Sequence, residues 1–309
     1  MAILVVGSVA LDSLRTPAGS AEEILGGSAT YFGLAASYFT DVSVIAVVGD
    51  DFPEEHVAFL QRKGIDTSGL QRVPGRTFRW KGEYSGDMNT ATTLETQLNV
   101  FADFRPEMSA EHRRRKFLFL GNIDPDLQRS VLEQMARPRV VACDTMNYWI
   151  NIKRDALRRT LAMVDIVLIN DAEARQLAGE ANLYRAARAV LASGPKALVV
   201  KRGEYGAALV EPGGIFVVPA YPLEQVVDPT GAGDSFAGGF MGFIAAKGNM
   251  DAGTLRQALV YGSVMASYNV TEFGPRGLAD LTFTEIEGRY REFRKLTQFD
   301  DVETSGARY

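Results

Sequence analysis

Residues 226–240, VVDPTGAGDSFAGGF, place small residues and a carboxylate where an extended segment passes into a helical run. Gly231, Ala232 and Gly233 stand at or just before the expected helix N-terminus, where small side chains let backbone N–H groups approach an anion. Asp234 follows in the first turn, where the helix dipole favours an ionised carboxylate. An anion hole beside a carboxylate can stabilise a transferring phosphoryl group and accept the proton of an attacking hydroxyl. The alternative is an ordinary helix start, in which Asp234 is a cap and the glycines only pack.

Several other catalytic devices do not occur in the sequence. It contains no G-K-[ST] triplet, no G-x-S-x-G elbow and no early G-x-G-x-x-G dinucleotide fingerprint. His56 and His112 lack the spacing of a zinc site, and Cys143 is the single cysteine. No intrachain disulfide can therefore form, and we expect Cys143 to be a buried strand residue.

The overall composition is that of a globular protein and argues against a polyanionic partner. The 309 residues are 46% hydrophobic and 23% charged, with a net charge of -5 at pH 7. This charge disfavours binding to nucleic acid or anionic lipid, and the basic run at residues 113–116 is expected to be a solvated helix end. No apolar run reaches the ~20 residues of a membrane helix. The first residues, MAILVVGS, lack the pattern of a signal peptide, so we expect a cytoplasmic protein.

Short apolar runs alternate with helical patterns along most of the chain. Continuous runs rich in Val, Ile and Leu are typical of strands buried on both faces of a parallel sheet. The alternation predicts a doubly wound α/β fold. The expected strands include residues 3–7, 42–49, 116–121, 139–144, 165–170 and 197–203. The expected helices include residues 27–39, 54–64, 128–138, 154–164 and 183–194.

Residues 11–24 and 75–101 interrupt this alternation. In the second segment Phe78, Trp80 and Tyr84 alternate with charged residues, and turn residues and a Thr-rich run follow, which is the pattern of a hairpin. We expect both segments to form a small sheet, the lid, over the crevice at the carboxyl ends of the parallel strands. Its aromatic side chains either stack on a base or sugar or hold the small sheet together.

The segment DPTGAGDSF resembles the C-terminal signature of the ribokinase/PfkB family of small-molecule kinases. The match includes Asp228, Thr230 and residues 231–234. Other family motifs occur in the same chain order over nearly the whole length: VVGSVALD with Asp12, LGGSAT with Gly26 and Gly27, LINDAEA with Asn170 and Glu173, and VVKRGEYGA with Lys201, Gly203 and Gly206. Their ordered co-occurrence is more specific than any one motif.

This resemblance implies one ribokinase-like α/β kinase domain over residues 1–309. Its doubly wound, mostly parallel sheet would be flanked by helices, with the lid inserted as residues 11–24 and 75–101. The resemblance implies ATP and Mg²⁺ as cosubstrates, Asp234 as the general base and residues 231–233 as the anion hole. Asp228 matches part of the monovalent cation (K⁺) site found in many relatives.

From this resemblance, from the position of Tyr31 and from the aromatic lid we assign binding roles to both sides of the site. Glu173 would act indirectly on Mg²⁺, which prefers hard oxygen ligands and keeps several waters. The residues that we assign to the acceptor are Asp12, Gly26, Gly27, Tyr31 and Trp80. Those assigned to the nucleotide are Asn170, Glu173, Lys201, Gly203, Gly206 and Thr230.

Taken alone, several of these residues also fit local structural roles. Asp12 fits a turn former, and the glycine pair fits a helix start. Asn170 and Glu173 fit a helix cap, and Lys201 fits an exposed strand end.

Two positions depart from the family pattern. Tyr31 stands where many sugar kinases have an asparagine, and an aromatic cannot make the paired hydrogen bonds of an amide to vicinal hydroxyls. In CDTMNYW, Asp144 matches the family's D-x-N segment, but Met146 occupies the asparagine position. Recognition of a ribose-type sugar is therefore open.

The favoured function is transfer of the γ-phosphoryl of ATP to a hydroxyl of a sugar, nucleoside or cyclitol. The alternatives are an adenosine-like nucleoside kinase specifically, or a non-catalytic sugar-binding regulator with a kinase fold. Asp234 favours an enzyme, because a regulator needs no base there. A nicotinamide-dependent oxidoreductase is disfavoured because the sequence lacks the early G-x-G-x-x-G fingerprint of a dinucleotide site. Lid edges that pair between subunits would give a homodimer.

Overall fold

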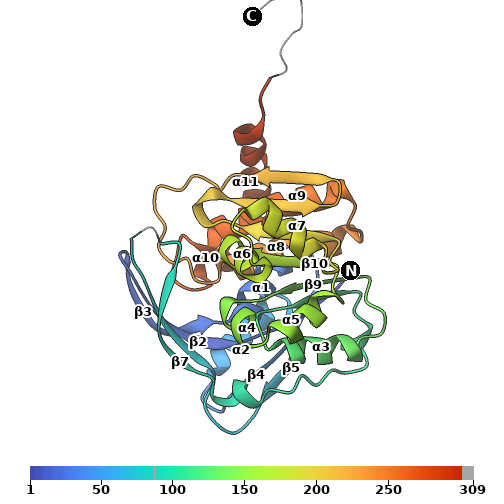
Figure 1. Ribbon diagram of the computed structural model, residues 1–309. Helices are drawn as coiled ribbons and strands as arrows, with labels where there is room; N and C mark the ends of the chain where they lie inside the picture. Colours follow the sequence, from blue (N-terminus) through green and yellow to red (C-terminus); the bar gives the residue numbers. More distant parts are fainter. Residues whose placement is uncertain (87, 301–309) are drawn as a thin grey trace, which may run out of the picture.

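The computed structural model describes residues 1–86 and 88–300, and these form a large sheet between two layers of helices (Figure 1). Within them, nine strands run in the order β13-β12-β11-β10-β9-β8-β1-β4-β5. Neighbours from β11 to β5 are parallel, whereas β12 pairs antiparallel with β11 and β13. The expected mostly parallel sheet is confirmed. Its strands are β1 (Ile3–Val6), β4 (Val42–Val48), β5 (Ile65–Arg72), β8 (Phe117–Leu120), β9 (Val140–Asp144), β10 (Ile166–Asn170), β11 (Ala197–Lys201), β12 (Ala207–Glu211) and β13 (Gly214–Val218).

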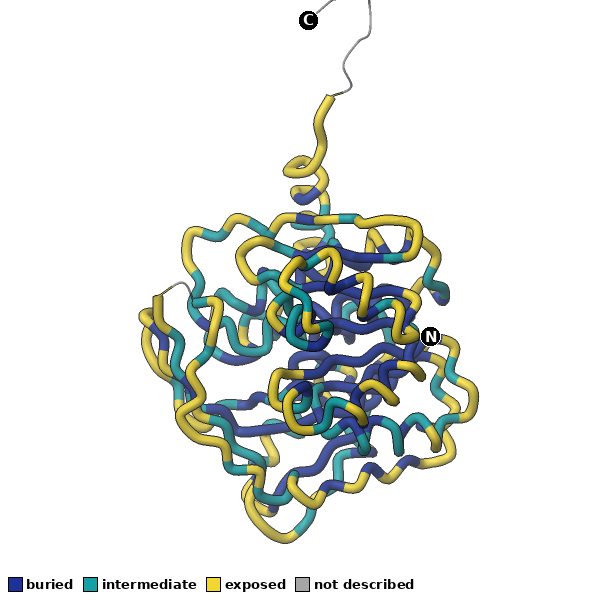
Figure 2. Tube along the Cα trace, in the orientation of Figure 1, coloured by how far each residue is buried: buried dark blue, intermediate teal, exposed yellow. Residues whose placement is uncertain are grey.

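Helices cover both faces because the central strands are apolar on both sides. Ile3 and Val5 of β1 lie in one core, whereas Leu4 and Val6 lie in the other. In Figure 2 the main strands run through the molecule as its buried centre. The first core is covered by α1 (Ser28–Ser37), α2 (Glu54–Arg62), α8 (Ala232–Lys247), α9 (Ala252–Asn269), α10 (Arg276–Ala279) and α11 (Phe283–Thr297). The second is covered by α3 (Pro125–Gln134), α4 (Asn147–Ile152), α5 (Arg154–Leu161), α6 (Asp171–Ala178) and α7 (Leu183–Leu191).

All six expected strands form, but β5, β12 and β13 were not among them. Strands β5 and β13 are only partly buried, so their sequences lack a continuous apolar run. Cys143 is a buried residue of β9, as expected.

The lid is a separate four-stranded sheet in the order β3-β2-β6-β7. Its strands are β2 (Ala10–Thr16), β3 (Gly19–Gly26), β6 (Arg79–Tyr84) and β7 (Ala91–Gln97). The strands thus span 10–26 and 79–97, where 11–24 and 75–101 were expected. Residues 99–101 at the end of the second segment belong to a 3₁₀ turn, Asn99–Asp103.

The connections place the lid at the carboxyl edge of the main sheet. Strand β2 follows the end of β1, and β6 follows the end of β5. Strand β1 lies between β4 and β8: the chain runs from β1 through β4 to β5 on one side, then returns to β8 and continues on the other side. Such a switch point creates a crevice at the carboxyl ends of the strands, where open α/β sheets bind ligands. Figure 1 shows the lid standing beside this edge.

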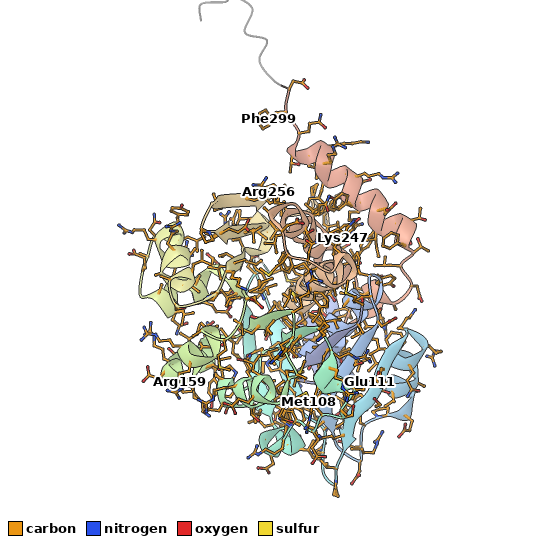
Figure 3. The ribbon with its side chains drawn as sticks, turned by 90° about the vertical axis from the view of Figure 1, so that its right-hand side faces the viewer. Met108, Glu111, Arg159, Lys247, Arg256 and Phe299 are labelled. Atoms are coloured by element: carbon orange, nitrogen blue, oxygen red, sulfur yellow. The ribbon has the colours of Figure 1, made fainter. Side chains whose placement is uncertain are left out.

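The C-terminal helix α11 packs on α9 through Ile286 and Phe293 and then leaves the body. Figure 3 shows Phe299 beyond its end, where 87% of the residue is exposed. Within the part of the chain that the structure describes, no helix combines the length and the apolar character needed to cross a membrane.

Candidate active site

The anion-hole segment forms the N-terminus of α8. Gly231 is the N-cap residue with φ +73°, in the left-handed region that favours glycine. The first N–H groups of a helix lack intrahelical acceptors, although here Ala232 N–H donates to Pro229 O over 3.1 Å. Gly231 and Gly233 therefore offer the better N–H donors for a phosphoryl group. Ala232, which we expected to be part of the anion hole, is a weaker candidate donor because its N–H is already bonded.

A cation adjoins this helix start. A Cβ atom at Gly233 would lie 3.0 Å from Lys201 Nζ, so the ammonium group sits directly beside the glycine backbone. The lysine side chain is only 17% exposed. Helix N–H groups and a shielded ammonium group together favour a multiply charged anion.

Lys201 is held by Asp144 across the strand ends. Lys201 Nζ donates to Asp144 Oδ2 over 2.8 Å, and both side chains are largely buried. Burial alone would lower the pKa of Lys201, but the carboxylates of Asp144 and Glu173 outweigh it and raise that pKa. The lysine stays protonated at neutral pH.

Asp234 lies in the same electrostatic cluster. Burial, reinforced by the charge of Asp144, raises the pKa of Asp234 to about 7, and Lys201 acts in the opposite direction. A carboxylate with such a pKa is a stronger base than an ordinary aspartate near neutral pH. The geometry thus joins an anion-binding helix end to a candidate proton acceptor.

Asn170 and Glu173 form a capping box at the start of α6, which is the local structural role that their sequence also fits. Glu173 N donates to Asn170 Oδ1 and Asn170 N donates to Glu173 Oε2, each over 2.8 Å. Burial and the charge of Asp144 raise the pKa of the Glu173 carboxyl group. The cap holds Glu173 beside Lys201 and Asp144, and its part in Mg²⁺ binding stays a prediction.

The acceptor side is built around Asp12, which is 4% exposed. A Cβ atom at Gly26 would lie 1.9 Å from Asp12 Oδ2, so only glycine leaves room for this carboxylate. Gly27 has φ +94° and a Cβ there would meet Ser8 O at 2.5 Å. Burial and the charge of Asp228 raise the pKa of Asp12 to about 7, partly offset by the Gly27 N–H. The glycine pair therefore shapes the cradle of Asp12 and also opens α1.

Trp80 lies beside Asp12 in the lid sheet. Asp12 of β2 pairs in register with Trp80 of β6, which puts both side chains on one face of the lid. A Cβ atom at Gly82 would lie 2.1–2.7 Å from the indole, so glycine lets the ring lie flat along the strand. The indole Nε1 donates to Thr93 Oγ1 over 3.3 Å. The ring is thereby oriented before any ligand binds.

Tyr31 lies beneath the anion-hole segment. Its side chain is 1% exposed, and a Cβ atom at Gly231 would lie 2.3–2.4 Å from its ring. Direct contact of Tyr31 with an acceptor stays a prediction.

Thr230 points toward the lid, and Asp228 braces the segment. Thr230 Oγ1 donates to the Tyr84 hydroxyl over 3.3 Å. Asp228 is fully buried, and its two oxygens accept from Thr230 N (2.9 Å) and Gly274 N (2.8 Å). The nucleotide role of Thr230 and the cation role of Asp228 stay predictions.

Gly203 and Gly206 bracket a 3₁₀ turn after β11, with φ +53° and +82°. A Cβ atom at Gly206 would clash with Val218 O at 2.1 Å, and one at Gly203 with Asn89 Oδ1 of the lid at 2.3 Å. The two glycines thus form a compact turn next to Lys201, and its contact with a nucleotide stays a prediction.

The donor set fits ATP with Mg²⁺. Buried Asn122 Oδ1 and Thr145 Oγ1, just beyond β8 and β9, have no hydrogen-bond partner among the described residues, which is costly unless a ligand supplies one. The same part of the chain holds no cluster of three His, Cys, Asp or Glu side chains suited to a metal. Proteins bind Mg²⁺ through one or two carboxylates together with substrate phosphates, and its place at this site stays a prediction.

A family model described as pfkB family carbohydrate kinase matches residues 3–280. The chain belongs to this family. Its kinase activity class follows from that membership, whereas the acceptor does not.

Individual relatives of this pfkB-family kinase act on different acceptors. The chain is 32% identical over 245 residues to a cytidine kinase of Thermococcus kodakarensis, covering 77% of this chain and 87% of the relative. It is 27% identical over 270 residues to a 2-dehydro-3-deoxygluconokinase of Dickeya dadantii, covering 74% and 79%. A nucleoside kinase of Burkholderia thailandensis, solved with inosine, superposes with a TM-score of 0.79 at 20% identity, covering 94% and 97%. At 20% identity the superposition shows that the two chains share a fold, and it assigns no acceptor to this chain.

Four side chains at this pfkB-family site were not among the residues that we assigned to catalysis or binding from the sequence. Asp144 holds Lys201, and its place at the end of an expected strand was an available signal. Tyr84 reaches Thr230, and Asn269 Nδ2 donates to Thr230 O over 2.7 Å. Gln128 Nε2 joins the ends of β8 and β9 through Gly121 O and Asp144 O, each over 2.9 Å. The last three depend on contacts between distant segments, which no local pattern reveals.

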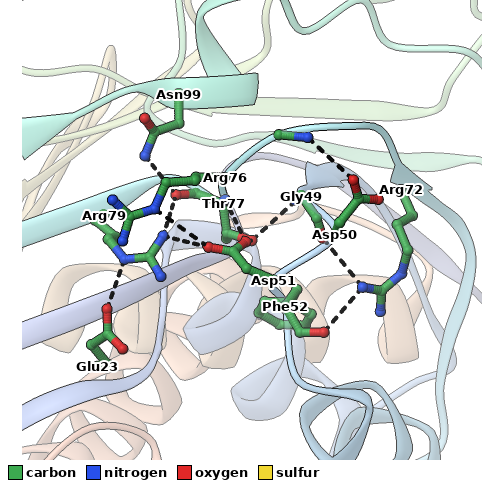
Figure 4. A network of polar contacts seen from close by, with 11 residues as sticks. Glu23, Gly49, Asp50, Asp51, Phe52, Arg72, Arg76, Thr77, Arg79 and Asn99 are labelled. Carbon is green, nitrogen blue, oxygen red and sulfur yellow. Dashed lines mark hydrogen bonds and ion pairs between the residues drawn. The ribbon is translucent and has the colours of Figure 1, made fainter.

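A polar network fixes the base of the lid (Figure 4). Asp51, just beyond β4, accepts from Thr77 N, Thr77 Oγ1 and Arg79 Nη1, each over 2.7 Å. Arg79 Nε also donates to Glu23 Oε1 of β3 over 2.8 Å. Burial of Asp51 would raise its pKa, but hydrogen bonds from Thr77 and Arg79 outweigh it and lower that pKa. Arg79 thus ties two lid strands to the body.

Proposed function

We propose that this kinase transfers the γ-phosphoryl group of ATP to the free hydroxymethyl group of a ribonucleoside. The observation that carries the proposal is the pairing of Asp12 with Trp80 on the crevice face of the lid. A carboxylate accepts hydrogen bonds from the vicinal hydroxyls of a ribose, and an indole stacks on a base. The similarity to the cytidine kinase supports the same acceptor class.

This binding mode leaves one ribose hydroxyl for the reaction. With the vicinal pair held by Asp12 and the base on Trp80, the remaining hydroxymethyl group faces the anion hole. Asp234 would accept its proton as the oxygen attacks the γ-phosphorus. Backbone N–H groups of Gly231 and Gly233, with the Lys201 ammonium group, would stabilise charge on the transferring group.

The ions take supporting roles in this proposal. Mg²⁺, when bound, would neutralise phosphate charge, with Glu173 and Asn170 on its side of the site. Asp228 is the candidate for a monovalent cation such as K⁺, since each of its oxygens retains a lone pair after accepting one N–H.

A second acceptor class has a specific observation in its favour. The similarity to the 2-dehydro-3-deoxygluconokinase spans 74% of the chain, so a sugar or a cyclitol is the alternative acceptor. A non-catalytic, kinase-like regulator is the remaining alternative, and the base-like pKa of Asp234 argues against it.

The test is ADP release from ATP and Mg²⁺ with separate acceptors: cytidine, uridine, adenosine, inosine, ribose, fructose, 2-dehydro-3-deoxygluconate and myo-inositol. The proposal expects the highest kcat/KM with a nucleoside, and release that is roughly 10²–10⁴-fold slower in the Asp234→Asn variant. Turnover of sugars alone would favour the alternative acceptor. No release with any of the eight would favour the regulator.

A further inference from the structure

The lid touches the anion-hole segment through one tyrosine. Tyr84 is the last residue of β6 and lies on the same face of the strand as Trp80, four residues earlier. Its hydroxyl accepts from Thr230 Oγ1 over 3.3 Å. Thr230 immediately precedes Gly231, the left-handed N-cap residue of α8. The lid therefore contacts the anion hole one residue away from its first candidate donor.

The backbone of Thr230 is already held by the body of the protein. Its N–H donates to Asp228 Oδ1 and its carbonyl accepts from Asn269 Nδ2. Ser235 Oγ in turn donates to Asn269 Oδ1 over 3.1 Å, which ties the same amide to the first turns of α8. The Thr230 hydroxyl is thus the group of this residue that faces the lid.

Tyr31 closes the other side of the segment. Helix α1 follows the lid strand β3 after one residue, and the ring of Tyr31 lies against Gly231. The Tyr31 hydroxyl is buried and has no hydrogen-bond partner among the described residues. Gly231 therefore lies against the ring of Tyr31 from α1, and it directly follows Thr230, whose hydroxyl is bonded to the lid.

The tip of the lid reaches the nucleotide side as well. Asn89 Nδ2 donates to Glu204 Oε1 over 3.2 Å, and Glu204 N donates to Asn89 Oδ1 over 3.3 Å. Glu204 belongs to the turn that follows Lys201 and its strand. The lid in this structure therefore bridges the acceptor crevice and contacts both segments that would bind phosphate.

We propose that the Tyr84 hydroxyl couples closure of the lid to the geometry of the anion hole. When the lid opens, Thr230 loses its side-chain partner and Gly231, which has the widest conformational freedom, loses support on that side. The N–H donors are then correctly placed only while the lid covers the acceptor. This arrangement would limit transfer of the phosphoryl group to water. Tyr84 is a positioning residue, and the inference rests on the proposed kinase reaction.

The kinetic test uses Tyr84→Phe with the best acceptor from the panel. Loss of one neutral hydrogen bond should lower kcat about five-fold while KM for ATP is unchanged. Tyr184→Phe, at an exposed position of α7, is the matched control and should leave kcat unchanged. In a double-mutant cycle, the kcat loss of Tyr84→Phe/Thr230→Val should be smaller than the product of the two single losses, whereas Thr230→Ser should keep most of the activity. An unchanged kcat or fully additive losses would overturn the coupling.

A second test does not depend on the acceptor. The chain has two tryptophans, so Trp149→Phe leaves Trp80 as the fluorescent reporter on the lid. A non-hydrolysable ATP analogue with Mg²⁺ should change its emission in Trp149→Phe but not in Trp149→Phe/Tyr84→Phe. Equal responses in both proteins, including none, would overturn the coupling. Absence of ADP release by the unmodified chain with every acceptor would instead contradict the proposed function.

Discussion

The ammonium group of Lys201 lies 2.8 Å from Asp144 Oδ2, joining the carboxyl ends of β11 and β9 across β10. Burial is the largest cause of the raised pKa of Asp234, and the pair adjusts it, because Asp144 raises that pKa further whereas Lys201 lowers it. One carboxylate therefore positions the cation for phosphate and also adjusts the candidate base.

Replacing Asp144 should move the pH dependence of turnover. In Asp144→Asn a like charge is removed and Lys201 loses its partner, and both changes lower the pKa of Asp234. We expect the acidic limb of kcat to shift to lower pH by about one unit. Steady-state kcat between pH 5 and 9 measures it, with exposed Asp155→Asn as the control. A limb that stays in place or moves to higher pH would contradict this account.

The unmodified chain should lose activity on acidification. A general base must be ionised, and the pKa of Asp234 is about 7, so kcat should fall tenfold per unit well below pH 7. Asp234→Asn should reduce kcat by roughly 10²–10⁴-fold and leave the Kd of ATP nearly unchanged. Near-normal turnover of this variant would exclude the general-base role.

The same substitution should stabilise the folded protein at alkaline pH. The folded-state pKa of Asp234 lies above that of an unfolded aspartate, so the folded state binds the proton more tightly and ionisation opposes folding. This cost grows as pH rises from about 4 to 7 and is full above pH 7. Asp234→Asn should therefore raise Tm at pH 8 more than at pH 5. Thermal unfolding at the two pH values measures the difference, and an equal change at both would contradict it.

How far the sequence predicts this molecule depends on whether a feature is local. The apolar runs of β1 and β4 and the glycines around Asp234 carry their own signal, so the sheet and the start of α8 could be predicted. Strand β5, IDTSGLQR, is only partly buried and has no such signal. The contacts of Thr230 with Tyr84 and with Asn269 join segments 146 and 39 residues apart, and only the fold brings them together.

Trp80 should distinguish nucleosides from sugars. If the indole stacks on a base, Trp80→Ala should raise KM for the best nucleoside roughly 5–150-fold, since one stacked base contributes about 1–3 kcal/mol. KM for ATP should not change. Trp149→Phe, in α4, is the control. An equal loss of affinity for a nucleoside and for free ribose would mean that Trp80 only holds the lid together through Thr93 and Gly82.

Arg79 should control how well the lid holds the acceptor. Its side chain is 14% exposed, and the guanidinium group bridges Glu23 of the lid and Asp51 of the body, so Arg79→Met removes both ion pairs while retaining much of the apolar stem. Asp51 would keep its bonds from Thr77 and so remain satisfied. We expect KM for the acceptor to rise roughly 5–10-fold, because an open lid is favoured. The uncoupled release of ADP without acceptor should not increase if Tyr84 sets the anion hole only in the closed state. Arg185→Met, which removes an exposed ion pair with Glu180, is the matched control. A rise in KM for ATP alone would place the effect of Arg79 outside the lid.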